Sequence, residues 1–245
     1  MVTQSRRPAF LLTRPPRQSQ RFVAELAERF GAGLRICESP VIAPRFRAPD
    51  LPSGPFDALV FTSETGVEGF AALNPANLPT LAYCVGDRTA DAARMIGLVA
   101  VSAQGDALAL AQLLEQSAPG QRLLYLHGQE TRRDLDSLLR PAGITLSDAV
   151  VYEQAECPLT PEARSLLAQQ DEIVLPLFSP RSAQIFFRQC AELAPKARIV
   201  VIALSPAVAE AVPPGGAHRI LVAQAPTASE MITQIAALFD AGTAA

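Results

Sequence analysis

The sequence is poor in the residue types on which many enzymes build metal centres. Only two histidines occur among its 245 residues, His127 and His218, so a metal centre with imidazole ligands is not expected. Lysine is almost absent, because Lys196 is the only one and all other basic residues are arginines. This bias fits a GC-rich genome. It fits a carboxylate-bearing ligand equally well, since the planar guanidinium group of arginine matches carboxylates.

The short motifs of common catalytic and nucleotide-binding folds are missing as well. There is no GxxxxGK[ST] phosphate loop, no GxGxxG turn after a strand, no GxSxG nucleophile turn and no HExxH helix. The cysteines show no CxxC spacing and have apolar neighbours, so we expect buried free thiols in a reducing compartment. They are Cys37, Cys84, Cys157 and Cys190.

Nothing in the composition points to a membrane or a nucleic acid. No apolar run approaches the length of a membrane-spanning helix. Residues 1–8 are polar and a short apolar strand follows at once, which does not resemble a signal peptide. The net charge of −3 gives no support for a nucleic-acid surface. We therefore expect a soluble, cytoplasmic protein.

One pattern occurs twice, and it consists of an apolar strand, a hydroxyl-bearing turn and an amphipathic helix. Residues 58–73 show it first, with Thr62 and Ser63 at the turn, and residues 172–193 repeat it with Ser179 at the turn. Each repeat is followed by another strand, turn and helix, which indicates two related α/β lobes. Helix N-termini at the carboxyl edge of a sheet suit an anionic ligand.

Strands alternate with helices along most of the chain, as is typical of parallel sheets covered on both faces. The expected strands are 9–13, 34–41, 58–61, 81–85, 98–101, 122–126, 146–156, 172–178, 198–203 and 219–223. The expected helices are 18–30, 64–73, 88–96, 107–116, 131–141, 161–169, 180–193, 206–212 and 228–240.

The order of these elements predicts a discontinuous domain. The first strand and helix are too small to fold alone, so we expect 1–38 plus 155–245 to form one lobe and 42–148 to form an inserted second lobe. Segments 34–42 and 146–156 are expected to run side by side as a two-stranded β linker. A cleft between the lobes, at the carboxyl ends of the strands, is the predicted ligand site.

The ordered set of segments LLTRP, DALVFTSETGV, VGDRTADAA, LLYLHGQETRRDL, VVYE, LFSPRSAQIFF and PTASEMITQI resembles the uroporphyrinogen-III synthase family over nearly the whole chain. The resemblance implies a monomer of two flavodoxin-like α/β lobes joined by a two-stranded linker. It also implies a lyase that needs no metal or cofactor. Such an enzyme cyclises hydroxymethylbilane with loss of water and inversion of ring D, and so gives uroporphyrinogen III for haem biosynthesis. The expected partner is this substrate, handed over by hydroxymethylbilane synthase.

The resemblance also implies site residues. Tyr152 resembles the tyrosine of the family's linker, whose phenol can donate a proton to the departing hydroxyl; packing on the linker is the alternative role. For the hydroxyl-bearing residues the alternative is helix capping, and for the arginine it is a surface position. The substrate-binding residues implied are Arg14, Thr62, Ser63, Thr89, Gly128, Ser179 and Thr227.

Three departures from the family pattern bear on function. His127 stands before Gly128 where relatives commonly carry an arginine, Pro206 replaces a threonine, and Glu64 lowers the positive potential beside the first turn. A non-catalytic tetrapyrrole- or anion-binding regulatory module of the same fold is therefore the second hypothesis. A sugar-phosphate or nucleotide enzyme of flavodoxin-like fold is a third, which the missing phosphate loop disfavours.

Overall fold

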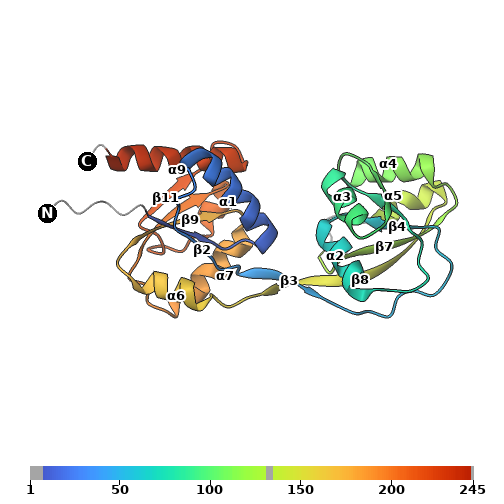
Figure 1. The fold of residues 1–245 in the computed structure, drawn as a ribbon, viewed down its shortest axis with the longest axis horizontal. Helices are drawn as coiled ribbons and strands as arrows, with labels where there is room; N and C mark the ends of the chain where they lie inside the picture. Colours follow the sequence, from blue (N-terminus) through green and yellow to red (C-terminus); the bar gives the residue numbers. More distant parts are fainter. Residues whose placement is uncertain (1–7, 131–134, 244–245) are drawn as a thin grey trace. The chain divides into compact units, whose positions relative to one another are not determined.

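The computed structural model describes residues 8–130 and 135–243, and it is an α/β protein (Figure 1). The chain divides into two compact units. Unit 1 comprises Met1–Ala43 and Glu156–Ala245, and unit 2 comprises Pro44–Ala155. Each unit contains one sheet, and all the strand pairs whose register is defined are parallel. The predicted α/β fold with two mostly parallel sheets is confirmed.

Unit 1 is built on a five-stranded sheet of order β11-β10-β9-β1-β2. Its strands are β1 (Ala9–Leu12), β2 (Ile36–Glu38), β9 (Glu172–Leu177), β10 (Arg198–Ala203) and β11 (Arg219–Val222). Its helices are α1 (Pro16–Phe30), α6 (Pro161–Ala168), α7 (Pro180–Ala191), α8 (Pro206–Glu210) and α9 (Ala228–Thr243).

Alternate side chains of the strands build a core on each face of this sheet. Phe10 of β1 packs with residues of α1 and α9, among them Phe22 and Ile235. The next residue, Leu11, points to the opposite face and packs with residues of α6, α7 and α8, among them Phe186. Successive side chains of a strand point to opposite faces, and both faces of this sheet are covered, which explains why the strand interiors are apolar on both sides.

Unit 2 is built on a six-stranded sheet of order β3-β8-β7-β4-β5-β6. Its strands are β3 (Ile42–Phe46), β4 (Ala58–Phe61), β5 (Leu81–Cys84), β6 (Val99–Ser102), β7 (Arg122–Gly128) and β8 (Thr145–Glu156). Its helices are α2 (Glu64–Leu73), α3 (Asp87–Met95), α4 (Ala107–Ser117), α5 (Leu135–Leu139) and a 3-10 turn at Arg140–Ala142. The predicted helix 131–141 includes residues 131–134, which lie outside the described part of the chain.

The strand orders show that the two units repeat one topology with a different starting point. Without its edge strand β3, the sheet of unit 2 has the order β6-β5-β4-β7-β8. The sheet of unit 1 has the order β11-β10-β9-β1-β2, so β4 in unit 2 occupies the position of β9 in unit 1. The segment β4-α2-β5 therefore corresponds to β9-α7-β10, which are the two segments in which the sequence pattern repeats. In both, the turn serine caps the helix: Ser63 accepts from the Gly66 amide and Ser179 from the Ser182 amide.

The strand expected at 34–41 is shorter in the structure, and a second strand follows it at Ile42–Phe46. Residues Ile36–Glu38 pair with β1 as the edge strand of unit 1, and a separate strand, β3, lies next to β8 in the sheet of unit 2. Pro40 separates the two strands, while Pro44 lies within β3. Proline is tolerated there because β3 is an edge strand, in which one side of the backbone needs no partner. The boundary between the units falls within β3 and within β8.

Helix α2 lies unusually close to the strands beneath it because two glycines face them. A Cβ atom at Gly66 would lie 2.8 Å from the carbonyl oxygen of Leu126 on β7. A Cβ atom at Gly69 would lie 2.8 Å from Cγ2 and 3.0 Å from the carbonyl oxygen of Val151 on β8. These glycines therefore set the position of the α2 N-terminus over the edge of the sheet.

The cysteines are all free, but only two of them are buried. Burial raises the pKa of the Cys84 and Cys190 thiols to about 11. Cys37 and Cys157 are only partly buried, so the expectation of four buried thiols is wrong for these two. Among the described helices, none combines the length and the hydropathy that crossing a bilayer requires.

Candidate functional site

The strand order predicts a position for a ligand site in each unit. In open parallel sheets, ligands bind beyond the carboxyl ends of the strands where the strand order reverses. This switch point lies between β4 and β7 in unit 2 and between β9 and β1 in unit 1. Five of the predicted site residues lie at these points. Thr62, Ser63 and Gly128 lie at the first, and Ser179 and Arg14 lie at the second.

A cavity of about 390 Å³ opens at the switch point of unit 2. Four predicted site residues line it, namely Thr62, Ser63, Gly128 and Tyr152. The lining also includes four polar residues that the sequence did not mark as substrate contacts: Asp106, Tyr125, His127 and Glu130. A larger and more open hollow of about 770 Å³ lies along β2 and α6 of unit 1, but it contains none of the predicted residues.

Tyr152 on β8 directs its phenol toward the turn after β4. Its hydroxyl oxygen lies 3.2 Å from Ser63 Oγ, which also accepts a hydrogen bond of 3.0 Å from the Gly66 amide. Ser63 therefore both caps α2 and contacts the phenol. The two hydroxyl groups line the cavity at a helix N-terminus, where they are able to donate a proton or a hydrogen bond to a ligand.

Tyr125 forms a second pair of this kind, which the sequence alone did not reveal. Its hydroxyl oxygen lies 2.8 Å from Thr62 Oγ1, and only 6% of the residue is exposed. The residue lies in the apolar run of β7, where the sequence pattern indicated only a buried strand. All three tyrosines of the chain, Tyr83, Tyr125 and Tyr152, lie in unit 2, but Tyr83 does not line the cavity.

The phenol of Tyr125 is expected to lose its proton at a higher pH than an exposed tyrosine. Burial raises its pKa more than the hydrogen bond with Thr62 lowers it. A pH titration of phenolate absorbance, wild type minus Tyr125→Phe, should show this group ionising above about pH 10. The folded protein then holds this proton more tightly than the unfolded chain. The stabilisation is complete below about pH 10 and is lost as the pH rises further. Ionisation at or below pH 10 would contradict the expectation.

Glycine is required at position 128 because the Tyr152 ring lies against it. It lies opposite Tyr152 in the β7–β8 pair, where the register shifts between His127 and Gly128. A Cβ atom at Gly128 would lie 2.5 Å from Cζ and 2.8 Å from the hydroxyl oxygen of Tyr152. Only glycine therefore leaves room for the phenol in its observed position.

His127 is held by acceptors on both sides of its ring. Nδ1 lies 2.7 Å from the Gly128 carbonyl oxygen, and Nε2 lies 3.0 Å from Asp148 Oδ2. Because both partners are acceptors, both contacts are hydrogen bonds only when each ring nitrogen carries a proton. The ring also stacks on Tyr125 with centroids 4.5 Å apart. His127 thus braces Gly128 and Tyr125, a role different from the carboxylate contact that an arginine would make.

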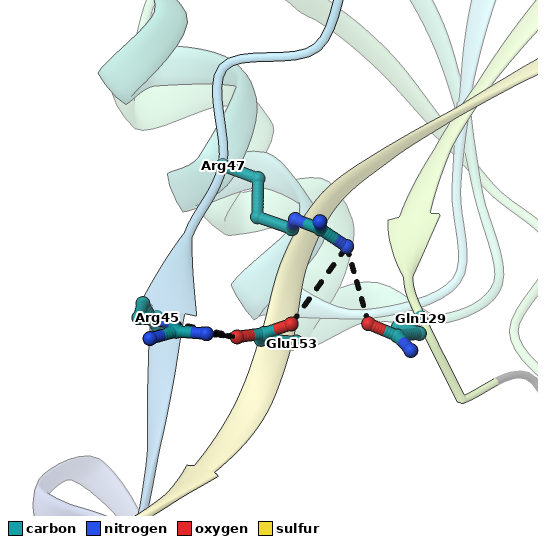
Figure 2. A network of polar contacts seen from close by, with 4 residues as sticks. All are labelled: Arg45, Arg47, Gln129 and Glu153. Atoms are coloured by element: carbon teal, nitrogen blue, oxygen red, sulfur yellow. Dashed lines mark hydrogen bonds and ion pairs between the residues drawn. The ribbon is translucent and has the colours of Figure 1, made fainter.

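Two arginines near Tyr152 are already paired with an acid (Figure 2). Arg45 on β3 donates from Nε to Glu153 at 2.6 Å and forms a second contact from Nη2. Arg47 contacts the other oxygen of Glu153 at 3.7 Å and donates to Gln129 Oε1 at 3.2 Å. Glu153 follows Tyr152 in β8, so this network lies on the residue next to the phenol. The arginine side chains are largely exposed, so each pair contributes little to stability.

The other predicted residues lie in unit 1 or outside the cavity. The Arg14 guanidinium lies 3.7 Å from the ring centroid of Phe178, and burial lowers its pKa. Ser179 donates to Ser182 Oγ at 2.9 Å as it caps α7. Thr227 accepts from the Glu230 amide at 3.2 Å and is exposed. Thr89, in the first turn of α3, is 5% exposed and lies outside the cavity lining. Substrate contacts from these residues stay predictions.

The lining of the unit 2 cavity carries more negative than positive groups. Asp106 caps α4 by accepting from the Leu108 and Ala109 amides, and Glu130 lies just beyond β7. Residues 8–130 and 135–243 contain no cluster of three His, Cys, Asp or Glu side chains arranged to hold a metal ion. The cavity therefore offers neutral hydroxyl donors beside carboxylates, a combination suited to a ligand that accepts hydrogen bonds and develops positive charge.

Comparison with known proteins identifies the family. The family model of uroporphyrinogen-III synthase HemD matches residues 22–233. A crystal structure of uroporphyrinogen-III synthetase from Helicobacter pylori shares the fold, with a TM-score of 0.59 at 18% identity over 94% of this chain and 99% of the other. A mutant uroporphyrinogen III synthase from Thermus thermophilus gives a TM-score of 0.44 at 16% identity, over 95% and 99% of the two chains. No curated protein sequence matches significantly. By its family match over most of its length, the chain belongs to the uroporphyrinogen-III synthase family.

Proposed function

We propose that this protein is an active uroporphyrinogen-III synthase, which converts hydroxymethylbilane to uroporphyrinogen III with loss of water and inversion of ring D. The observation that carries the proposal is the Tyr152–Ser63 pair, which presents hydroxyl donors to a cavity at the switch point of unit 2. We also propose that the protein works as a cytoplasmic monomer without metal or cofactor. In this proposal it receives its substrate from hydroxymethylbilane synthase.

In the proposed reaction the protein supplies a proton to the terminal hydroxyl and holds ring D in the orientation that leads to inversion. Tyr152 donates its proton to the terminal hydroxyl, the carbon–oxygen bond breaks with its electron pair on oxygen, and water leaves. The pyrrole nitrogen supplies the electron pair that forms the azafulvene. The ring D carbon that already carries the methylene bridge to ring C attacks the azafulvene carbon and forms a spiro intermediate. The bond between that carbon and the bridging methylene then breaks, and the methylene bonds to the free α carbon of ring D, so that the ring is inverted. That α carbon loses its proton, which returns to the phenolate. Since closure without inversion proceeds unaided, the protein chiefly restricts which carbon attacks.

The charges of the cavity support this assignment. Breaking the carbon–oxygen bond leaves positive charge on the pyrrole ring, and the carboxylates of Asp106 and Glu130 line the same cavity. Fixed negative charge beside a developing cation lowers the barrier. The substrate's own carboxylates are disfavoured beside these acids. We therefore propose that the substrate presents its terminal hydroxyl, and not a carboxylate, to this part of the cavity.

The test is an isomer assay. Porphobilinogen is supplied to purified hydroxymethylbilane synthase with and without this protein, the products are oxidised, and porphyrin isomers I and III are separated by chromatography. We expect isomer III to dominate only when the protein is present. Heat-denatured protein is the control, and it should give isomer I.

A persistent yield of isomer I with folded protein would favour the second candidate, a non-catalytic tetrapyrrole- or anion-binding module. One observation favours that module. At the turn after β10, Ser205 makes no side-chain capping hydrogen bond and Pro206 occupies the first helical position, so the threonine hydroxyl common in relatives is lost. A binding module would retain tetrapyrroles without changing the ratio of isomers.

Gly128→Ala should reduce activity while leaving the fold intact. The added methyl group would approach within 2.5 Å of the Tyr152 ring, so the phenol must move away from Ser63. We expect kcat to fall about tenfold or more, because a misplaced acid transfers its proton less efficiently. Gly33→Ala is the control, because a Cβ atom there meets nothing within 4 Å. If Gly128→Ala keeps wild-type kcat, the position of the phenol does not limit the reaction.

A further inference from the structure

Two phenol–hydroxyl pairs line the unit 2 cavity at consecutive residues of one turn. Tyr125 pairs with Thr62 at 2.8 Å, and Tyr152 pairs with Ser63 at 3.2 Å. Each pair has two hydroxyl protons, and a hydrogen bond between two oxygens uses only one of them. Within residues 8–130 and 135–243, no other acceptor is paired with these hydroxyls. Each pair therefore has one O–H group left for a ligand in the cavity.

Tyr125 is a preorganised donor. Its ring stacks on His127, which in turn contacts the Gly128 carbonyl at 2.7 Å and Asp148 at 3.0 Å. Burial raises the pKa of Tyr125, so the phenol keeps its proton at neutral pH. Because the ring is already fixed, donating to a ligand costs little further conformational entropy.

We propose that Tyr125, together with Thr62, donates a second hydrogen bond to the departing hydroxyl of the substrate, beside Tyr152 and Ser63. The inference rests on the proposed function, since it assumes that the cavity receives this hydroxyl. Tyr152 transfers its proton as the carbon–oxygen bond breaks and water forms. Tyr125 keeps its proton and stabilises the negative charge that develops on the oxygen. Tyr152 regains its proton from the α carbon of ring D that gains the bridging methylene.

The chain offers a matched control for a purely structural role. Tyr83 on β5 is 5% exposed and packs in the same core cluster as Tyr125, but it does not line the cavity. Removing its hydroxyl therefore changes a buried phenol of unit 2 without removing a donor to the substrate.

The experiment compares kcat and KM for isomer III formation among Tyr125→Phe, Thr62→Val, Thr62→Ser and Tyr83→Phe. Tyr125→Phe is also measured in a Tyr152→Phe background. We expect Tyr125→Phe and Thr62→Val each to lower kcat about tenfold, the usual cost of one hydrogen bond to a group that becomes charged. KM should change less, because the bond strengthens in the transition state. Thr62→Ser, which keeps the hydroxyl, should retain most activity, and Tyr83→Phe should match wild type.

Each outcome decides between the proposals. If wild type forms isomer III but Tyr125→Phe keeps the parent kcat in both backgrounds, the second donor is overturned and the proposed function stands. An equal loss of kcat in Tyr125→Phe and Tyr83→Phe would also overturn the second donor, because removing any buried phenolic hydroxyl of unit 2 would then have the same effect. If wild type forms only isomer I, the proposed function itself fails. Circular dichroism checks the fold of each variant. If Tyr125→Phe does not fold, the kcat of Thr62→Val tests the proposal instead.

Discussion

Replacing Tyr152 with phenylalanine is expected to lower kcat for isomer III formation about 100-fold, the lower range of what a positioned acid supplies. The ring and its packing remain, so only the proton donor near Ser63 is lost. Since unaided closure continues, the product should shift toward isomer I. Both kcat and the isomer ratio are measured in the coupled assay with purified hydroxymethylbilane synthase.

Tyr83→Phe again serves as the control, because it removes a phenol of unit 2 that does not line the cavity. A Tyr152→Phe variant with unchanged turnover would exclude the phenol as the acid, since the hydroxyl group is all that changes. Retained isomer III at a reduced rate would mean instead that the protein still holds ring D and has lost only proton transfer.

Gly66→Ala should destabilise unit 2 by about 2 kcal/mol, as overpacking of a close contact commonly does. A new Cβ atom would lie 2.8 Å from the Leu126 carbonyl oxygen, which belongs to the backbone of a central strand and cannot move easily. In an exposed helix interior the same exchange stabilises a protein by up to about 1 kcal/mol. The sign of the effect thus distinguishes close packing from ordinary helix propensity. Urea unfolding followed by far-ultraviolet circular dichroism measures it.

Gly69→Ala should destabilise in the same direction, because its Cβ atom would lie 2.8 Å from Cγ2 and 3.0 Å from the carbonyl oxygen of Val151. Gly33→Ala is the matched control in unit 1 and should change the free energy of unfolding by no more than about 0.5 kcal/mol. If Gly66→Ala is as stable as wild type or more stable, α2 is able to move away from β7, and its N-terminus is less firmly placed than the structure indicates.

Periodicity predicted most of the fold because the strands and helices have clear local signals. The strand at 58–61 and the helix at 64–73 coincide with β4 and α2, and the second repeat ends within two residues of the predicted limit at α7. Helix α7 has the predicted cap at Ser179, and the cap of α2 is Ser63, one of the two residues that the sequence offered. Such features depend on residues close in sequence, so the chain reveals them without tertiary information.

Features that depend on tertiary contacts were harder to predict. Residues 34–41 have the pattern of a strand broken by Pro40, yet the pairing with β1 limits this strand to Ile36–Glu38. The residues that follow form β3 next to β8, which their local sequence did not indicate. Tyr125 shows the same limit at the site. Within the apolar run of β7 it has the pattern of a core residue, and only the adjacent end of β4 brings Thr62 to its hydroxyl. Thr89 is the converse case, because it follows a turn as a contact residue would but is buried outside the cavity lining.

The confinement of all three tyrosines to unit 2, in a chain without tryptophan, gives the protein a natural spectroscopic label. Intrinsic tyrosine fluorescence arises from unit 2 alone, whereas far-ultraviolet circular dichroism reports the helices of both units. Unfolding curves from the two signals coincide only if the units unfold together. The unlabelled wild-type chain can therefore reveal whether its two sheets form one cooperative structure or two.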